Sequence, residues 1–147
     1  MVGVDNDTVT AAIAAALYPH AQIRAEGFET TRVPADSFVA TIGNVPFGNF
    51  TLIDPAHNPG RFSIHNHFIN KAISLTAPPG GYVTVLTSRY TLDSLDSRAR
   101  RAMAAKADLL ARYACRRTPS SGLLAPKSSP TSWCYAAKTP TRPPTRT

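Results

Sequence analysis

Short apolar runs alternate along the chain with longer stretches of helical character. In the first part, Val2–Asp5 and Ala21–Ala25 have the length of strands and flank an alanine-rich stretch, Thr8–Leu17. Asp7 or Thr8 is a suitable N-cap for a helix over that stretch, because a short polar side chain there accepts from an otherwise unpaired backbone N–H. The start of the chain therefore predicts a strand, a helix and a second strand.

The middle of the chain contains the two strongest strand patterns. Phe38–Ile42 has the length and β-branched content of a buried strand, and Tyr82–Thr87 is the clearest strand of all. A helix is expected between them over Ile64–Leu75, with Ser63 as its cap. A loop is expected over Phe50–Arg61, where turn residues gather.

One further element follows in the pattern. Residues 95–107 predict a basic helix. Within the helix expected over Ile64–Leu75, one apolar face is expected in the core; it consists of Phe68, Ala72 and Leu75. Strands that alternate with helices in this way predict an α/β fold with a parallel sheet.

The most informative stretch follows the strand expected at Phe38–Ile42. It reads Asn44-Val45-Pro46-Phe47 and stands where an open α/β sheet binds its ligands, beyond the carboxyl end of a strand. The Asn44 side-chain oxygen and the Val45 carbonyl can both accept from an exocyclic amine, which offers two donors. Pro46 keeps Val45 extended, and Phe47 can stack on a flat ring. An ordinary strand-to-loop turn is the alternative interpretation.

Asn44–Phe47 resembles the Asn-Pro-Pro-Tyr/Phe motif of N6-adenine DNA methyltransferases. The longer strings Ile42–Gly48, Asp54-Pro55, Phe62–Asn66 and Leu86–Thr91 are similar to the helicase-associated adenine methylases of bacterial mobile elements. The resemblance spans roughly residues 2–112, and the order of its pieces is more specific than the tetrapeptide alone. Val45 stands where the family pattern usually has its first proline. The backbone carbonyl at this position is kept, but the rigidity that a proline ring gives the backbone is lost.

The resemblance implies a fold, a reaction and a cofactor. The fold is a partial Rossmann-like sheet of an S-adenosylmethionine-dependent methyltransferase, and the reaction is methyl transfer to N6 of a flipped adenine in DNA. Asp5 occupies the position that grips the cofactor ribose, although an acid near a helix start more often stabilises the helix dipole. Phe28 is expected on the cofactor adenine or in the core, and Gly27 supplies no side chain where relatives carry an acid or amide.

Charge is distributed unevenly and bears on the partner. Residues 1–88 hold four basic and six acidic side chains, whereas residues 89–147 hold twelve basic and three acidic ones. Such asymmetry favours attraction to nucleic acid, and a solvated basic tail is the alternative. Arg89, after the strand at Tyr82–Thr87, is expected to contact phosphate or to pair with Asp93 or Asp96. The resemblance adds DNA as a partner, with a helicase or a complementing methylase polypeptide.

Metal binding, secretion and membrane insertion are not expected. His57, His65 and His67 lie close together in sequence, but no Cys or Glu completes a zinc set, so surface or pocket-lining roles are expected for them. Two cysteines give no disulfide framework, which is typical of a reduced cytoplasmic protein. No apolar run approaches the ~20 residues of a membrane span, and no signal peptide is recognisable.

Both ends of the chain depart from a complete methyltransferase. Residues 1–114 are expected to form a partial methyltransferase domain that lacks the first strand and its Gly-rich loop. Residues 115–147 are expected to be a disordered basic tail: positions 118–147 hold six prolines, eleven Ser or Thr and no acids. If residues 122–135 are encoded by GC-rich codons, translation of the same DNA in a reading frame shifted by two nucleotides permits a Gly-Thr turn followed by an apolar strand. The tail is therefore interpreted as the product of a frameshift.

Three functions remain open from the sequence. The chain is a catalytic DNA adenine methylase, a noncatalytic remnant of one, or a methyltransferase for rRNA or protein glutamine, since related motifs bind other planar amides and bases. Cofactor binding separates the first two, and assays on duplex DNA, rRNA and protein separate the first from the third.

Overall fold

The structure, a computed structural model, describes residues 1–76, 80–115 and 132–138. The chain forms two compact units, residues 1–33 and residues 34–147.

The first unit is a strand, a helix and a strand. β1 (Val2–Asp5) and β2 (Gln22–Ala25) pair in parallel, with Gly3 opposite Ile23, and α1 (Thr8–Leu17) connects them. Asp7 is the N-cap of α1: its side chain accepts from the Thr10 N–H at 2.7 Å, which confirms one of the two expected caps. The predicted order of elements is therefore correct here.

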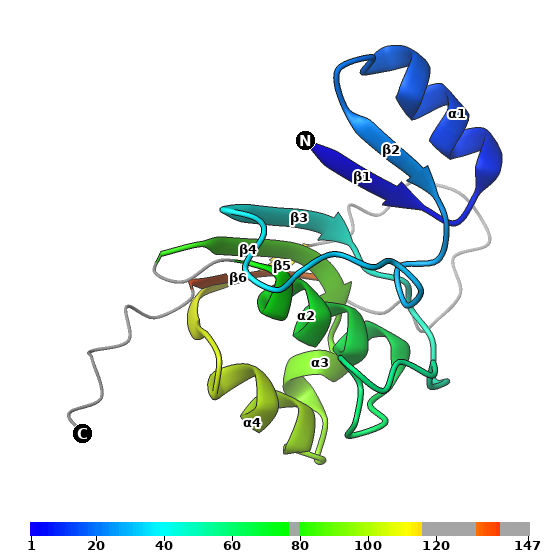
Figure 1. The fold of residues 1–147 in the computed structure, drawn as a ribbon. Coiled ribbons are helices and arrows are strands. Elements are labelled where there is room, and N and C mark those ends of the chain that lie inside the picture. The colour runs from blue at the N-terminus through cyan, green and yellow to red at the C-terminus, as the bar shows by residue number, and fades with distance from the viewer. Residues whose placement is uncertain (77–79, 116–131, 139–147) are drawn as a thin grey trace, which may run out of the picture. The chain divides into compact units, whose positions relative to one another are not determined.

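Within the residues that the structure describes, the second unit holds a four-stranded sheet and three helices, and Figure 1 shows their arrangement. Its elements, in chain order, are β3 (Ala40–Asn44), α2 (Ile64–Leu75), β4 (Tyr82–Ser88), α3 (Tyr90–Asp93), α4 (Arg98–Ala104), β5 (Asp108–Cys115) and β6 (Ser132–Lys138). The strand order is β3-β4-β6-β5; β3 and β4 are parallel, and β6 is antiparallel to both of its neighbours.

The core of this unit lies on one face of β3 and β4, under α2 and α4. Val83 and Val85 of β4 are 0% and 2% exposed and pack with Ile69 of α2 and Met103 of α4. Figure 1 shows the helices of this unit on the same side of the sheet. The expected core face of α2 is confirmed, since Ala72 and Leu75 are 3% exposed and Phe68 packs against the core cluster.

The second face of β3 and β4 is open within the described residues. Side chains alternate across a strand, so Ile42 and Tyr82 point away from α2, and they are 83% and 50% exposed. The expectation of a buried strand at Phe38–Ile42 is therefore wrong. Two features account for this exposure. The strand begins later than expected, at Ala40, and among the described residues β3 pairs with β4 alone, at an edge of the sheet.

Two other boundaries differ from those expected. The basic helix predicted over 95–107 is the shorter α4, preceded by the single turn of α3. The expected domain boundary after residue 114 falls inside β5, and residues 132–138 form β6, so the expectation of disorder is wrong for those seven residues. Their sequence, Ser-Trp-Cys-Tyr-Ala-Ala-Lys, carries aromatic residues of high strand propensity. The rest of the tail lies outside the described residues.

Candidate functional site

The carboxyl ends of β3 and β4 lie at the same edge of the sheet. The two strands are parallel and in register, with Asn44 opposite Leu86, and the Val45 N–H continues the ladder by donating to the Leu86 carbonyl at 3.1 Å. The residues that follow β3 and those that follow β4 therefore emerge side by side. Asn44 and the segment after Thr87 therefore share one edge of the sheet.

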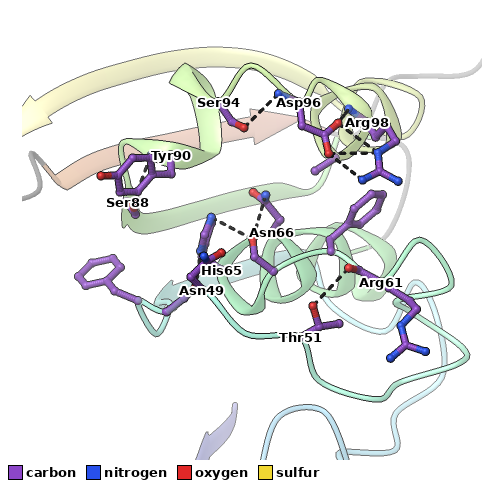
Figure 2. Close-up of a pocket in the computed structure, with 15 residues that line it drawn as sticks. Asn49, Thr51, Arg61, His65, Asn66, Ser88, Tyr90, Ser94, Asp96 and Arg98 are labelled. Atoms are coloured by element: carbon purple, nitrogen blue, oxygen red, sulfur yellow. Dashed lines mark hydrogen bonds and ion pairs between the residues drawn. The ribbon is translucent and has the colours of Figure 1, made fainter.

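A cavity of about 750 Å³ opens beside these strand ends. Phe47 comes from the loop after β3, Ser88 ends β4, and Tyr90 begins α3. Figure 2 shows Ser88 and Tyr90 on one side, with His65 and Asn66 of the first turn of α2 on the other. The cavity thus combines the aromatic rings of Phe47 (48% exposed), Tyr90 (55% exposed) and Phe62 with a lining that otherwise consists mostly of polar side chains. This mixture is typical of a site for a flat, hydrogen-bonding ligand.

The four residues of the central motif lie at different depths. Phe47 lines the cavity, Val45 is 5% exposed and belongs to the core cluster, and Asn44 is exposed at the end of β3. Alternation along β3 puts Val45 on the α2 face and Asn44 on the opposite, open face. Pro46 is half-buried between Val45 and Phe47. The structure therefore brings Phe47 to the cavity and leaves the Asn44 amide outside its lining.

The loop that carries Phe47 is attached to the start of α2. His65 is 6% exposed; its Nδ1 lies 3.3 Å from the Gly48 carbonyl and its Nε2 lies 3.1 Å from Ser63 Oγ. Because a carbonyl only accepts, Nδ1 is the donor and Nε2 accepts from the Ser63 hydroxyl. Burial lowers the pKa of His65, which keeps the ring neutral. The Ile64 N–H also donates to the Phe50 carbonyl at 2.8 Å. Two hydrogen bonds thus fix the loop after β3 on the helix.

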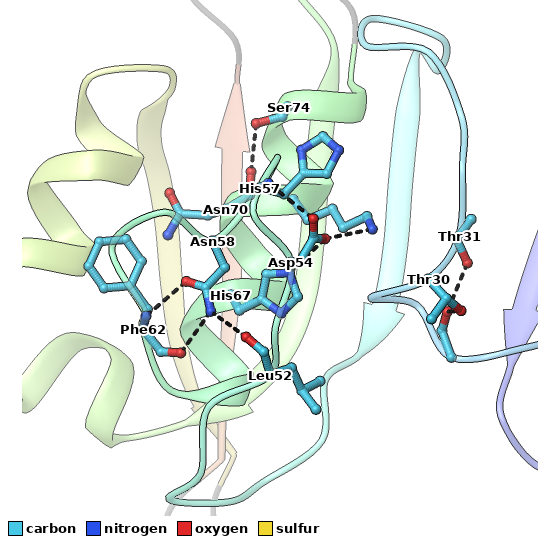
Figure 3. A network of polar contacts seen from close by, with 12 residues as sticks. Thr30, Thr31, Leu52, Asp54, His57, Asn58, Phe62, His67, Asn70 and Ser74 are labelled. Atoms are coloured by element: carbon cyan, nitrogen blue, oxygen red, sulfur yellow. Dashed lines mark hydrogen bonds and ion pairs between the residues drawn. The ribbon is translucent and has the colours of Figure 1, made fainter.

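Buried ionised side chains hold the next part of the same loop. Asp54 Oδ2 accepts from Lys71 Nζ at 2.9 Å and from His67 Nε2 at 3.1 Å, and all three side chains are 0% exposed (Figure 3). Burial raises the pKa of Asp54, but hydrogen bonds from Lys71 and His67 outweigh it and lower the pKa to about 2. A charged carboxylate therefore connects the loop to the interior of α2.

This buried cluster was not predicted. Asp54 appeared only in the expected loop and in one of the strings that resemble the adenine methylases. His67 was expected at the surface or in a pocket, which is wrong because it binds the buried carboxylate. The sequence contains one signal that could have indicated it. Lys71 and His67 are four residues apart on α2, so they lie one above the other on the same face of a largely buried helix.

Arg89 interacts with its neighbour rather than with an acid. It precedes α3, its guanidinium carbon lies 5.1 Å from the centroid of the Tyr90 ring, and Nη2 donates to the Tyr90 hydroxyl at 3.4 Å. This hydroxyl contact raises the pKa of Arg89. Asp96 pairs instead with Arg98, at 2.8 Å. Arg89 is exposed and remains a candidate for phosphate contact.

The two residues expected at a cofactor lie in the first unit. Asp5 ends β1, and its Oδ1 accepts from the Asp7 N–H at 2.8 Å, just before α1. Phe28 follows β2 and is half-buried. Asp5 therefore stabilises the turn before the helix, whose N-cap is Asp7. Its role at a cofactor stays a prediction.

Neither a metal site nor a membrane span is found in the part of the chain described. Among those residues, no three His, Cys, Asp or Glu side chains are grouped closely enough to hold a metal ion. None of the described helices has the length and hydropathy needed to cross a bilayer.

Comparison with known proteins shows which fold this is. The chain matches no protein-family profile and no curated protein sequence. It is similar to the crystal structure of the N-methyltransferase NodS from Bradyrhizobium japonicum WM9, with a TM-score of 0.58 and 11% identity over 95% of this chain and 72% of NodS. The complex of NodS with S-adenosyl-L-homocysteine gives a TM-score of 0.56 at 12% identity, and covers 95% of this chain and 66% of NodS.

A second similar structure is the [4+2]-cyclase SpnF, with a TM-score of 0.56 and 13% identity over 96% of this chain and 67% of SpnF. The chain thus spans about two thirds to three quarters of the length of these proteins. At such identities the likeness shows the fold alone, which is the expected α/β, Rossmann-like fold. Since SpnF is described as a cyclase, the fold does not determine the reaction.

Proposed function

We propose that the chain is an S-adenosylmethionine-dependent methyltransferase domain whose substrate is the N6 amino group of an adenine flipped out of DNA. One observation carries this proposal. The Asn44-Val45-Pro46-Phe47 motif stands at the carboxyl end of a parallel strand, and the neighbouring strand ends beside a cavity walled by Phe47 and Tyr90. Ligands of open α/β sheets bind at this edge.

The motif supplies acceptors on two sides of an amine. The Val45 N–H donates to the Leu86 carbonyl of β4. In an extended residue the carbonyl points to the same side of the strand as the N–H, so the Val45 carbonyl is directed towards β4. Ser88, which ends β4, lines the cavity on that side. The Asn44 amide is exposed at the strand end and reaches the amine from the other side by rotating about its side-chain bonds. Together they hold the amino nitrogen so that its lone pair faces an incoming methyl group.

Aromatic stacking supplies much of the binding to the base. A ring of adenine's size placed against Phe47 gains about 1–3 kcal/mol, as bases do on aromatic side chains of other nucleic-acid-binding proteins. Tyr90 offers a second ring from the start of α3, and the Arg89 guanidinium lies against it. Extrusion of a base costs a few kcal/mol, which such stacking offsets.

The cofactor is proposed from the fold and from the first unit. Asp5 has one carboxylate oxygen engaged with Asp7 and a second that can accept from ribose hydroxyls, and Phe28 offers an aromatic edge after β2. S-adenosylmethionine, when bound, provides the electrophilic methyl group, so the chain's own residues need only bind, orient and exclude water. No strong base is required of them.

The test is methyl transfer from labelled S-adenosylmethionine, measured with duplex DNA, rRNA and glutamine-containing protein as acceptors. We expect label in DNA and none in the other two. Calorimetric titration with S-adenosylmethionine is run in parallel, because a chain that binds the cofactor and labels only rRNA or protein contradicts the DNA assignment. A chain that binds no cofactor is the noncatalytic remnant. If it regains activity with a second polypeptide, it belongs to a split enzyme.

A further inference from the structure

We propose that Arg61 binds a phosphate of the nucleic-acid strand that carries the target base, so the substrate of the cavity is a polynucleotide rather than a free base or a protein side chain. This inference deepens the proposed function and rests on it. Arg61 is one of three charged residues that line the cavity, with Asp96 and Arg98. The three differ in whether their charge is already balanced.

Arg61 is the charged residue of the lining that is not paired with an opposite charge from the lining. Asp96 and Arg98 form a bidentate pair: Arg98 Nη2 donates to Asp96 Oδ2 at 2.8 Å and Nε donates to the same carboxylate at 3.1 and 3.2 Å. Across residues 34–76 and 80–115, the Arg61 guanidinium has no recorded hydrogen bond or ion pair. Figure 2 shows it directed away from the Asp96–Arg98 pair. Because His65 is neutral, the lining bears one net positive charge, which suits an anionic ligand.

The backbone of Arg61 is held in an unfavourable conformation. Its φ is 49°, in the left-handed region that residues with a side chain rarely occupy. A glycine would adopt this conformation without strain, yet the chain has an arginine at this position, directly after Gly60. Non-glycine residues held in this region are often found at ligand sites, where the surrounding structure imposes the conformation.

Asn58 imposes the conformation here. It is 3% exposed; its side chain donates to the carbonyls of Leu52 and Phe62, at 3.2 and 3.1 Å, and accepts from the Phe62 N–H at 2.8 Å. The Arg61 N–H donates to the Asn58 carbonyl at 3.0 Å. The turn is thus fixed at both of its ends, and Arg61 is presented from a rigid support at the rim of the cavity.

The position fits a phosphate rather than the base itself. A flipped base remains joined to its strand through the sugar, so its phosphates stay outside when the base enters the cavity. A guanidinium at the rim that points outward meets that backbone, and its planar set of donors matches phosphate oxygens. The contact fixes the register of the strand without reading its sequence.

The experiment measures binding of a fluorescein-labelled, single-stranded DNA with one adenine, by anisotropy over a range of salt concentrations. Loss of one phosphate contact lowers the slope of log affinity against log salt by about 0.7 for a single strand. We expect this change in Arg61→Gln and the wild-type slope in Arg61→Lys. Arg101→Gln is the matched control, because Arg101 is exposed on α4 and lies outside the cavity lining.

A second arm locates the phosphate. A single neutral methylphosphonate beside the adenine lowers the slope of the wild-type chain by the same amount and leaves Arg61→Gln unaffected. The proposal is overturned if Arg61→Gln behaves like Arg101→Gln, if the methylphosphonate affects both chains equally, or if the wild-type chain does not bind the strand. Titration with S-adenosylmethionine is independent of these readouts. Cofactor binding without strand binding overturns the phosphate contact and the DNA substrate but leaves the methyltransferase reaction, whereas strand binding without cofactor binding contradicts the methyltransferase reaction and leaves the phosphate contact.

Discussion

Asn44 is the single residue on which the proposed chemistry depends most. Its amide is exposed at the end of β3, on the face opposite Val45, and it lies outside the lining of the cavity that contains Phe47. Its part in binding an amine therefore requires the side chain to swing over the strand end when the base arrives. Val45 and Phe47 need no such movement.

We predict that Asn44→Ala lowers methyl transfer by a factor of about 10²–10³, the usual loss when one oriented polar group is removed from a reacting centre. Cofactor affinity stays unchanged, because the proposed contacts to the cofactor come from Asp5 and Phe28 and not from Asn44. Initial rates with duplex DNA and calorimetry of S-adenosylmethionine binding provide the two readouts. Ile42→Ala, an exposed change on the same face of β3, is the control and should retain full activity.

The identity of the individual site residues was only partly predictable. The motif Asn44–Phe47 indicated a strand end and the loop that brings Phe47 to the cavity, because neighbouring residues determine local chain geometry. The roles of Asn44 and Val45 as acceptors stay predictions. Asp54, Lys71 and Arg61 were not predicted, because their roles depend on contacts between positions far apart or on a backbone angle imposed by Asn58. Such constraints arise from packing and leave little trace in a single sequence.

Among the elements, α2 and the loop before it form the support of the site. The loop contributes Phe47 and Arg61 to the cavity, and it is attached to α2 through His65 at one end and through Asp54 further along. Asp54 and Lys71 are an ion pair with both side chains at 0% exposure. Removal of one partner from a buried pair leaves an uncompensated charge and costs about 3–5 kcal/mol.

We predict that Asp54→Asn loses this amount of unfolding free energy at neutral pH, because Lys71 is then buried without its carboxylate. The double variant Asp54→Asn with Lys71→Met, which removes both charges, should recover most of the loss. Urea denaturation followed by circular dichroism measures both. If the single variant is as stable as the wild type, the buried pair does not form in solution.

The same pair predicts how stability depends on pH. The pKa of Asp54 is lowered from 3.8 to about 2 in the folded chain, so its contribution is fully present above about pH 4 and is lost as the pH falls from there towards 2. The shift corresponds to about 2–3 kcal/mol. Asp7 and Asp96 also have lowered pKa values. The contribution of Asp54 is therefore the difference in unfolding free energy between the wild type and the double variant, measured at each pH.

Element prediction was most successful where the pattern is local. The strands at Val2–Asp5 and Tyr82–Ser88 and the helices at Thr8–Leu17 and Ile64–Leu75 match the expected ranges closely. The direction of β6 and its place between β4 and β5 could not be derived, because strand pairing is decided by contacts between distant segments. The frameshift interpretation of the tail stays a prediction, and sequencing of the gene beyond residue 114 tests it.

For the molecule as a whole, the open face of β3 and β4 is the main departure from an ordinary α/β protein. Parallel sheets are normally covered on both faces, yet Ile42 is 83% exposed while Val85 on the covered face is 2% exposed. The apolar side chains Val9, Ile13 and Leu17, four residues apart on α1, are also more than half exposed. Large exposed apolar areas favour association with other surfaces.

We predict that the two faces respond in opposite ways to a charged residue. Ile42→Lys changes the free energy of unfolding by less than about 0.5 kcal/mol, as exposed substitutions do, whereas Val85→Lys prevents folding because it buries an unpaired charge. Thermal denaturation compares the two. A strong loss of stability in Ile42→Lys would show that this face is covered in solution.

The measurement that bears most directly on the proposed function is the identity of the nucleoside that receives the methyl group. The chain is incubated with duplex DNA and S-adenosylmethionine that carries a deuterated methyl group, and the DNA is digested to nucleosides and analysed by mass spectrometry. The proposed function predicts trideuterated N6-methyladenine, and no label when purine, which lacks the amino group, replaces adenine. Label on cytosine, or no labelled nucleoside from a chain that binds both cofactor and DNA, would contradict it.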